Sequence, residues 1–336
     1  MKSEKPAGKS KIRAEIIGTG SYVPETRMTN KDLEGKIETT DAWIVERTGI
    51  RERRIASKDE AASDLAFQAA RKALEAAQVA PEEIDLIVLA TSTPDMFFPS
   101  TACIVQDKLK ATRAAAFDLS AACSGFVYAL AVGEQYIRSG TYQKVLVIGT
   151  EIMSRLINWT DRTTCVIFGD GAGAVLLAPS ASESGILSTH LHSDGSLWDL
   201  ICVPGGGSAI PPSEKMLAEQ LNTIKMKGNE TFKVAVRSLE EVAWEALRAN
   251  DFLPSDVSFL VPHQANLRII RAVADRLQLP MERVVINLDR YGNTSAASIP
   301  LALDEAVREG RIKKGDMLLF LAFGGGLTWG ASLVRW

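Results

Sequence analysis

Several features that would place a chain in a specialised class of protein are scarce in these 336 residues. Cysteine occurs four times, with no Cys-x-x-Cys pair and no histidine at metal-ligating spacing: Cys103, Cys123, Cys165 and Cys202. This pattern argues against a disulfide framework and against a zinc site. No apolar run reaches membrane-spanning length, and the polar start MKSEKPAGKSK lacks the apolar core of a signal peptide. We therefore expect reduced thiols, no metal, no membrane contact, a cytoplasmic location and a disordered tail over residues 1–11.

Excess charge of either sign is also missing. The formal net charge is −3, with 24% charged residues, so nothing in the overall balance points to nucleic acid as a partner. A site for an acidic partner would have to be a local basic patch. Hydrophobic residues make up 46% of the chain, which is enough for the core of one large or two ordinary domains.

What the chain does contain is an internal repeat. Residues 70–90 align without a gap to residues 243–263, at an offset of 173 positions, and each segment is typical of an amphipathic helix, a Pro-led turn and a buried strand. The same offset aligns 119–130 with 292–303 and 145–149 with 318–322. Three matches in one order indicate two homologous halves, which we place at 12–180 and 185–336.

Each half alternates helices with nearly continuous apolar strands, a pattern typical of a sheet covered on both faces. Two such halves related by a pseudo-twofold axis predict a layered α/β sandwich. The helices that follow Cys123 and Asn293 are equivalent under the repeat, so we expect their N-termini to meet near that axis. His263 ends the strand equivalent to residues 84–90, which predicts that three polar groups converge there.

Cys123 lies in the segment AACSGF, where an extended stretch gives way to a helical pattern that ends at Gly140. Unpaired N–H groups at a helix N-terminus favour a thiolate, so we expect a lowered pKa for this thiol. The alternative is a buried cysteine that packs as a small hydrophobic residue.

Two further polar residues stand out. His263, in VPHQAN, lies where a strand gives way to a helix, a common position for functional side chains in α/β folds, whereas His190 and His192 alternate as on a strand and are interpreted as structural or surface residues. Asn293 opens a helix rich in small residues, and its alternative interpretation is an N-cap or turn asparagine.

Three glycine-rich stretches call for separate interpretations. FGGGLTWG (323–330) requires unusual backbone angles or close approach to a ligand. GDGAGA (169–174) matches neither a dinucleotide-binding nor a P-loop pattern, so we expect close backbone packing. VPGGGSAIPPSEK (203–215) is expected to form a surface loop.

Taken together, these motifs resemble those of the condensing enzymes of the thiolase superfamily, and most of all the β-ketoacyl-acyl carrier protein synthase III family. The resemblance runs from IIGTGSYVPE (16–25) through WIVERTGIRER (43–53), AACSGF and VPHQANLRII to the C-terminus. It implies a thiolase-like α/β/α/β/α fold and an acyltransferase that initiates type II fatty-acid synthesis. Such an enzyme condenses an acyl primer, carried by cysteine and taken from an acyl-CoA such as acetyl-CoA, with malonyl-acyl carrier protein. The product is a 3-ketoacyl carrier protein, and no cofactor is implied.

The resemblance also implies roles for individual residues. It assigns the catalytic triad to Cys123, His263 and Asn293, and the oxyanion-binding N–H groups to Cys123 and Gly326. It places Trp43 and Arg162 around the adenine of coenzyme A, with Arg47 near the phosphates. Along the pantetheine passage it places Gly228, Asn229, Phe232, Ala265 and Asn266. Phe98 would close the primer pocket from the partner subunit of a homodimer, and Lys233 and Arg268 would contact the acidic carrier protein.

Other members of the superfamily fit less well. A thiolase needs a second cysteine beside the C-terminal glycine run, which reads LAFGGG here, and elongating ketosynthases use a histidine where this chain has Asn293. Two alternatives remain. One is a synthase III-like enzyme of specialised metabolism with another primer or with malonyl-CoA, and the other is a non-catalytic partner subunit.

Overall fold

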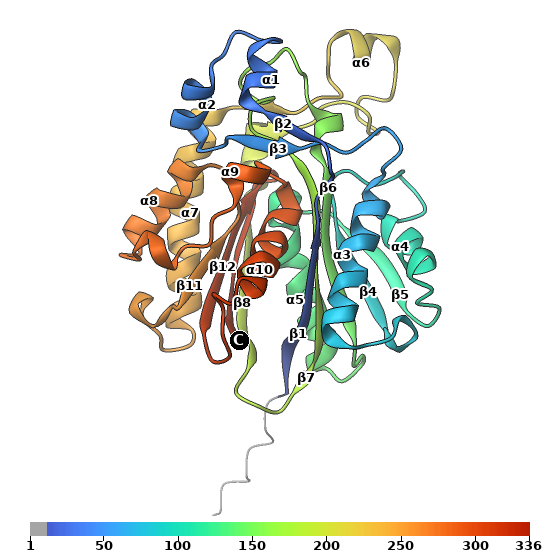
Figure 1. The fold of residues 1–336 in the computed structure, drawn as a ribbon, viewed down its shortest axis with the longest axis vertical. Coiled ribbons are helices and arrows are strands. Elements are labelled where there is room, and N and C mark those ends of the chain that lie inside the picture. Colours follow the sequence, from blue (N-terminus) through green and yellow to red (C-terminus); the bar gives the residue numbers. More distant parts are fainter. Residues whose placement is uncertain (1–11) are drawn as a thin grey trace, which may run out of the picture.

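The computed structural model describes residues 12–336, so the tail expected over residues 1–11 lies outside the described residues. Two main sheets stand side by side with helices between them and on their outer faces (Figure 1).

The first sheet has five strands, in the order β1 (Arg13–Tyr22), β7 (Asp170–Ser180), β6 (Val145–Ile152), β4 (Leu86–Ala90) and β5 (Ala115–Leu119). β7 runs antiparallel to both β1 and β6, whereas β4 is parallel to β6 and β5. β4 and β6 consist entirely of buried residues, as their continuous apolar sequences predict.

The second sheet has four strands, in the order β11 (Phe259–Pro262), β12 (Met317–Gly324), β13 (Thr328–Arg335) and β8 (Gly185–Ser193). β11 pairs with β12 in parallel, and β13 is antiparallel to both β12 and β8. This sheet repeats four strands of the first one in order and in pairing direction. The equivalent strands are β8 and β1, β13 and β7, β12 and β6, and β11 and β4. The repeat found in the sequence is therefore a repeat of architecture, while the exact limits of the two halves stay a prediction.

Long helices form the other three layers. α5 (Gly125–Arg138) and α10 (Ser298–Arg308) lie between the two sheets, and α5 contacts both of them. α3 (Ala62–Ala77) and α4 (Thr101–Leu109) cover the outer face of the first sheet. α7 (Gly228–Arg248) covers the second sheet and packs against α8 (Leu267–Arg276).

The shorter elements gather at one end of the sheets, at the top of Figure 1. They are β2 (Arg27–Thr29), α1 (Asn30–Glu34), α2 (Asp41–Thr48), β3 (Glu52–Arg54), β9 (Ile201–Cys202), α6 (Glu214–Ala218), β10 (Lys225–Met226) and α9 (Leu288–Tyr291). Two 3₁₀ turns, η2 (Ala122–Ser124) and η7 (Ser295–Ala297), lead directly into α5 and α10.

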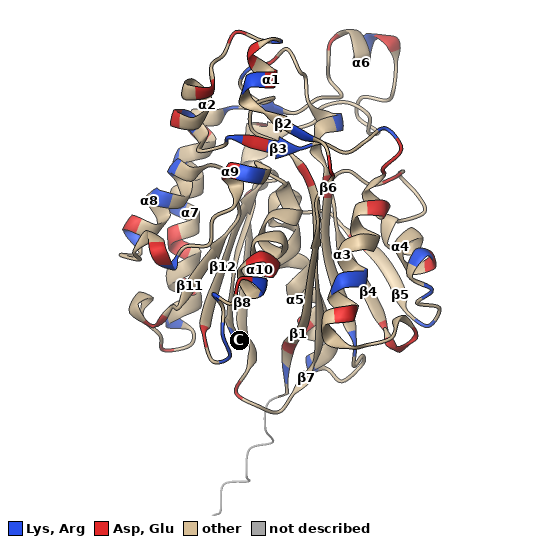
Figure 2. Cartoon of the chain, in the orientation of Figure 1, with Lys and Arg blue, Asp and Glu red and all other residues tan. Residues whose placement is uncertain are grey.

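Charged residues follow this layering. Lys, Arg, Asp and Glu lie mainly on the outer helices, the loops and the short strands β2 and β3, whereas the strands of the two main sheets carry few of them (Figure 2). None of the described helices combines the length and the apolar character that a membrane crossing requires.

The GDGAGA segment packs as its sequence predicts. A side chain on Gly173 would lie 2.6 Å from the backbone nitrogen of Leu301, and one on Gly169 would lie 2.3 Å from the carbonyl oxygen of Tyr291. Glycine is therefore required for the first sheet to approach α9 and α10 closely.

Candidate active site

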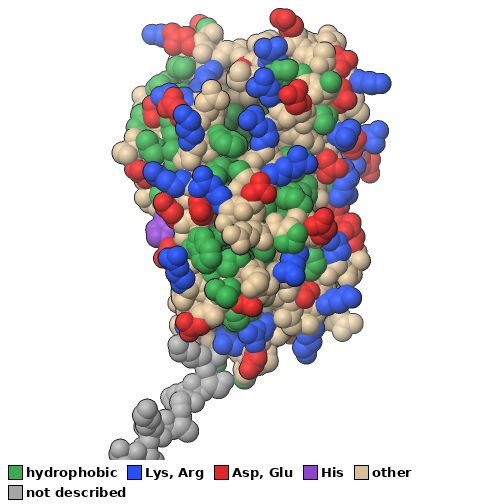
Figure 3. Space-filling view, turned by 90° about the vertical axis from the view of Figure 1, so that its left-hand side faces the viewer, with side chains coloured by type: hydrophobic (Ala, Val, Ile, Leu, Met, Phe, Trp, Pro, Cys, Tyr) green, Lys and Arg blue, Asp and Glu red, His purple; other side chains and the backbone are tan. Residues whose placement is uncertain are grey.

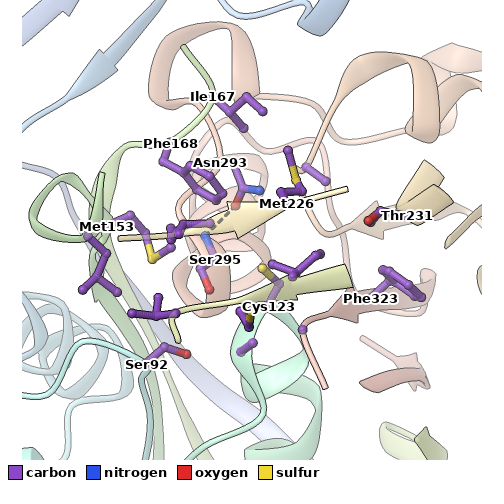
Figure 4. A pocket seen from close by; sticks show the side chains of 18 of the residues that line it. Ser92, Cys123, Met153, Ile167, Phe168, Met226, Thr231, Asn293, Ser295 and Phe323 are labelled. Atoms are coloured by element: carbon purple, nitrogen blue, oxygen red, sulfur yellow. Dashed lines mark hydrogen bonds between the residues drawn. The ribbon is translucent and has the colours of Figure 1, made fainter. Parts of the chain in front are cut away.

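A cavity of about 620 Å³ opens where the two halves meet, and residues of both halves line it. Its wall includes Cys123 from η2, His263 after β11, and Asn293 and Ser295 near the start of η7. The rest of the wall is largely apolar, with Met153, Ile167, Phe168, Ile224, Met226, Ile269 and Phe323 among its residues. Figure 4 shows Cys123 and Ser295 directed into the same space, with Asn293 beyond Ser295.

Cys123 is held at the meeting point of the two central helices. A Cβ built on Gly125 would lie 3.3 Å from the Cβ of Ala296, so α5 begins directly beside η7, as the repeat predicts. The Ser124 hydroxyl donates to the carbonyl of Thr328 (2.9 Å), and the Thr328 hydroxyl donates to the carbonyl of Ala121 (3.0 Å). These bonds fix η2 against β13.

The expected low pKa of the Cys123 thiol is wrong for the free protein. Burial raises this pKa to about 12, and the negative charge of Glu151 raises it further, while a hydrogen bond with Ser295 opposes both effects. Desolvation of the thiolate therefore outweighs the helix N-terminus. The thiol of the free protein is therefore protonated at neutral pH.

His263 is neutral in this site, because complete burial lowers the pKa of its imidazole to about 3. Its Nδ1 lies 2.6 Å from the Ser298 hydroxyl oxygen, which also accepts the N–H of Gln264 at 3.4 Å. Because Ser298 accepts from Gln264, its hydrogen is free to be donated to Nδ1. We infer that Nε2 carries the proton and acts as a hydrogen-bond donor.

Asn293 has one end of its amide engaged. Its Oδ1 accepts the N–H of Ser295 at 2.8 Å, the bond drawn in Figure 4. This bond matches the turn-asparagine interpretation, but it uses only the oxygen. The NH₂ group remains available as a donor, so the two interpretations are compatible.

The glycine run contributes to the cavity one residue earlier than the resemblance implied. Gly325 lines the cavity, whereas Gly326 is not among the lining residues and a Cβ there would meet Thr328 at 2.9 Å. Gly324 packs against the nucleophile, since a Cβ on it would lie 2.6 Å from the Cys123 backbone nitrogen. We therefore transfer the proposed second oxyanion donor from Gly326 to Gly325.

Four of the five residues expected along the pantetheine passage line the cavity: Gly228, Phe232, Ala265 and Asn266. The fifth, Asn229, is exposed in the first turn of α7 and does not line it.

The residues expected around adenine form a separate cluster. The guanidinium groups of Arg162 and Arg47 lie 4.9 and 5.7 Å from the centre of the Trp43 ring. Asn266 connects this cluster to the cavity, because its Nδ2 donates to the carbonyl of Arg47 at 3.0 Å.

The residues expected to meet other molecules are exposed. Phe98 is 85% exposed and does not line the cavity of its own chain, although its neighbour Phe97 does. Lys233 and Arg268 lie at the surface on α7 and α8, with the guanidinium of Arg268 over the ring of Phe232 at 5.6 Å. Figure 3 views the side of the molecule with these helices, where basic side chains are interspersed with acidic ones.

Sequence reasoning missed two parts of the site. The stretch 203–215 was expected on the surface, yet Val203, Gly205, Gly206 and Gly207 line the cavity. Up to α6 the stretch is a loop of half-buried and exposed residues, as expected, but its first residues also form part of the cavity wall, where the glycines let the backbone line the space. Glu151 was also missed, although an acidic residue at the end of the apolar run VLVIGT (145–150) was a usable signal.

Comparison with known proteins agrees with this geometry. Two models of 3-oxoacyl-[acyl-carrier-protein] synthase III match, the synthase III model over residues 117–195 and its C-terminal model over residues 247–336. The chain is 55% identical to β-ketoacyl-[acyl-carrier-protein] synthase III of Methylococcus capsulatus, over 96% of the chain and 99% of that protein.

Two solved structures are similar over 96% and 98% of the chain. The crystal structure of 3-oxoacyl-[acyl-carrier-protein] synthase III from Aquifex aeolicus has a TM-score of 0.90 at 52% identity, with 100% of that chain covered. The priming β-ketosynthase of the R1128 polyketide pathway has a TM-score of 0.89 at 36% identity, with 99% of that chain covered.

Proposed function

Because the chain belongs to the β-ketoacyl-acyl carrier protein synthase III family and has its thiolase-like fold, we propose how its residues carry out the family's reaction. The protein is an acyltransferase that condenses an acyl group from acyl-CoA with malonyl-acyl carrier protein and so initiates fatty-acid synthesis. Cys123, His263 and Asn293 are the proposed catalytic residues.

In the first half-reaction the Cys123 sulfur attacks the acyl-CoA thioester, and coenzyme A leaves. The tetrahedral intermediate carries a negative oxygen, which needs two fixed donors. The backbone N–H groups of Cys123 and Gly325 are the proposed pair, because Gly324 holds the glycine run against Cys123. Exchange between two thioesters is nearly balanced in energy, so positioning supplies much of the catalysis.

In the second half-reaction malonyl-acyl carrier protein loses CO₂, and the resulting enolate attacks the acyl group on Cys123. Negative charge then grows on the malonyl thioester oxygen. His263 and Asn293 each offer an N–H donor, and a pKa of about 3 keeps His263 neutral. Two neutral donors stabilise the enolate without transferring a proton.

The single observation that carries this proposal is that both halves deliver these three side chains to one cavity. To test it, the protein is incubated with acetyl-CoA and its peptides are examined by mass spectrometry. We expect one acetyl group, on Cys123. Acetylation only at Cys103, Cys165 or Cys202, or nowhere, would overturn the mechanism.

Coenzyme A is proposed to bind along the line from the Trp43 cluster to the cavity. Trp43 and Arg162 would hold the adenine ring and Arg47 the phosphates, with Asn229 at the cavity mouth. Support comes from the stacking of both guanidinium groups on Trp43 and from the Asn266 bond to Arg47.

The carrier protein is proposed to dock on α7 and α8 through Lys233 and Arg268, both exposed beside Phe232 of the cavity wall. Acidic partners are steered by such cations at low ionic strength.

A homodimer is proposed because the loop that carries Phe98 exposes three large apolar side chains: Met96 (48%), Phe97 (82%) and Phe98 (85%). A partner would cover them and gain Phe98 in its primer pocket. Light scattering at working concentration should show a dimer, and Phe98→Ala should admit longer primers. A monomeric active enzyme would contradict this.

The cytoplasm is the proposed location, since Cys103, Cys123, Cys165 and Cys202 are all unpaired.

A second candidate function is priming in specialised metabolism. The similarity to the R1128 priming β-ketosynthase favours it, because that protein has a similar fold and belongs to a polyketide biosynthetic pathway. A survey of acyl-CoA chain lengths, run once with malonyl-acyl carrier protein and once with malonyl-CoA, separates the two. Preference for acetyl-CoA and the carrier-bound extender supports the fatty-acid role.

A further inference from the structure

Glu151 is a fully buried carboxylate at the end of β6, close to the active-site cysteine. Its two oxygens accept the N–H of Ser92 at 3.2 and 3.0 Å. Oε2 also accepts the Thr93 hydroxyl at 2.7 Å and the Thr91 hydroxyl at 3.3 Å. A carboxylate buried among so many donors is held in one place, and nothing in the mechanism above uses it.

Ser295 connects Glu151 to the nucleophile. Its hydroxyl donates to Oε1 of Glu151 at 3.0 Å. Ser295 and Cys123 line the same cavity, and Ser295 lowers the pKa of the Cys123 thiol by favouring the thiolate. The backbone N–H of Ser295 donates to Asn293, which fixes the backbone of this turn. The three side chains therefore follow one another in the order sulfur, hydroxyl and carboxylate.

We propose that Glu151 accepts the Cys123 proton through Ser295 as the thiol attacks the acyl-CoA. The inference rests on the proposed function, because it describes how its first step is made possible.

The protons and charges of this step balance. The S–H proton passes to the Ser295 oxygen while the Ser295 proton passes to Oε1, so Glu151 becomes a neutral acid and Cys123 forms its bond to the acyl carbon. When coenzyme A leaves as a thiolate, Ser295 donates its hydroxyl proton to the leaving sulfur, which is bonded to the same tetrahedral carbon as the Cys123 sulfur, and Glu151 returns its proton to Ser295. A single negative charge is present throughout, so the buried site never holds two.

The environment of Glu151 suits an acceptor of this kind. Burial is the main reason that the pKa of Glu151 is raised to about 7, while its hydroxyl and amide donors lower this pKa. A general base is most effective when its pKa is close to the working pH. Among the neighbouring elements, η2 brings the titratable Cys123, while the 91–93 loop and η7 bring only hydroxyl and amide groups. Asp170 on β7 is turned to Ser154 and to the N–H of Ala56.

The test is the pH profile of Cys123 acylation, measured in a single turnover with acetyl-CoA from pH 5.5 to 9. In the unaltered protein the rate should rise with pH through a midpoint near 7, as Glu151 loses its proton. Glu151→Gln and Ser295→Ala should remove this rise and slow acylation by about a hundredfold or more at pH 7.5, the usual value of a positioned base.

Thr93→Val is the matched variant. It leaves the chain from Cys123 to Glu151 intact but removes a donor that stabilises the charged carboxylate, so the midpoint should move to higher pH. It also keeps the inference testable if Glu151→Gln fails to fold.

Equal slowing at every pH in Glu151→Gln, or an unmoved midpoint in Thr93→Val, would overturn the relay and reduce Glu151 to a structural residue. Acetylation of Cys123 in the unaltered protein would still support the proposed function, so the two failures are distinguishable.

Discussion

The turns η2 and η7 occupy equivalent positions in the two halves, but they carry different side chains of the site. Residues 122–124 and 295–297 correspond at the offset of 173, both precede a central helix, and Ala122 and Ser295 share a left-handed backbone, with φ of 45° and 47°. The proposed nucleophile Cys123 corresponds to Ala296, and the proposed donor Asn293 corresponds to Ser120. Under the proposed function, one scaffold used twice divides a two-step reaction between its two copies.

The two turns are also held in the same way, each by a strand of the opposite half. A Cβ on Gly149 of β6 would lie 2.2 Å from the carbonyl oxygen of Ala296, and one on Gly324 of β12 would lie 2.6 Å from the nitrogen of Cys123. Each turn therefore packs closely against a strand of the opposite half.

The largest effect is expected from replacing Asn293, which is proposed to act only in the second half-reaction. Asn293→Ala should slow release of labelled CO₂ from malonyl-acyl carrier protein by about a hundred- to a thousandfold, the usual cost of one fixed donor. Acylation of Cys123 should stay nearly normal, so acyl-enzyme should accumulate. His263→Ala should stall at the same step. Normal CO₂ release from Asn293→Ala would leave this residue as a turn asparagine only.

The next effect concerns the two glycines. Gly149→Ala and Gly324→Ala should each lower the free energy of unfolding by about 1–3 kcal/mol, because each added methyl group overlaps backbone atoms. Gly324 packs on the turn with Cys123 and Gly149 packs on the turn that follows Asn293. If the two turns serve different half-reactions, Gly324→Ala should slow acylation more and Gly149→Ala should slow CO₂ release more. Urea unfolding and the two half-reaction assays measure this, and equal slowing of both steps in both variants would refute it.

A third prediction uses the opposite pKa shifts of Glu151 and His263. Glu151 holds its proton longer in the folded state, so its contribution to stability is lost as pH rises from about 4.5 to 7. His263 stays neutral when folded, so its contribution is lost as pH falls from about 6.5 to 3. Between pH 5 and 6.5 the two slopes oppose each other, each by up to about 1.4 kcal/mol per pH unit.

Single variants separate these slopes. Between pH 5 and 6.5, Glu151→Gln should make stability rise more steeply with pH, whereas His263→Gln should flatten or reverse the rise. Urea unfolding at several pH values measures both, with His192→Gln on β8 as the control for replacing a histidine. Slopes that change in the same direction would show that one of the two assignments is wrong.

The smallest effect is expected from charge reversal at the proposed carrier-protein docking surface. Lys233→Glu and Arg268→Glu should raise the KM for malonyl-acyl carrier protein several-fold at low salt and less at high salt, while Cys123 acylation is unchanged. Lys110→Glu, at the end of α4 in the other half, is the matched control. An equal loss in both half-reactions would show that these cations support the fold rather than docking.

The sequence predicted much of this architecture for a physical reason. The repeat preserves buried strands and helix faces, so the match of 70–90 with 243–263 appears as α3 with β4 and as α7 with β11. The three residues of the proposed triad could be singled out because a cysteine, a histidine and an asparagine stand beside those equivalent helices and strands.

Other features depend on distances that one sequence does not encode. The pKa of Cys123 depends on how completely folding removes water from around its sulfur. The helical pattern of the sequence does not give the burial of a single side chain. Glu151 is connected to Ser295, 144 positions away along the chain. The choice between Gly325 and Gly326 turns on a single residue of register at the end of β12.

The reciprocal hold of each turn by the opposite half limits how this protein can change by recombination. Because the strand that packs on each turn belongs to the other half, an exchange of whole halves near residues 180–185 between two enzymes of this family would place each turn against a strand from the other parent. Such an exchange keeps the close packing only where both parents carry glycine at positions 149 and 324. The two halves are therefore expected to change together rather than independently.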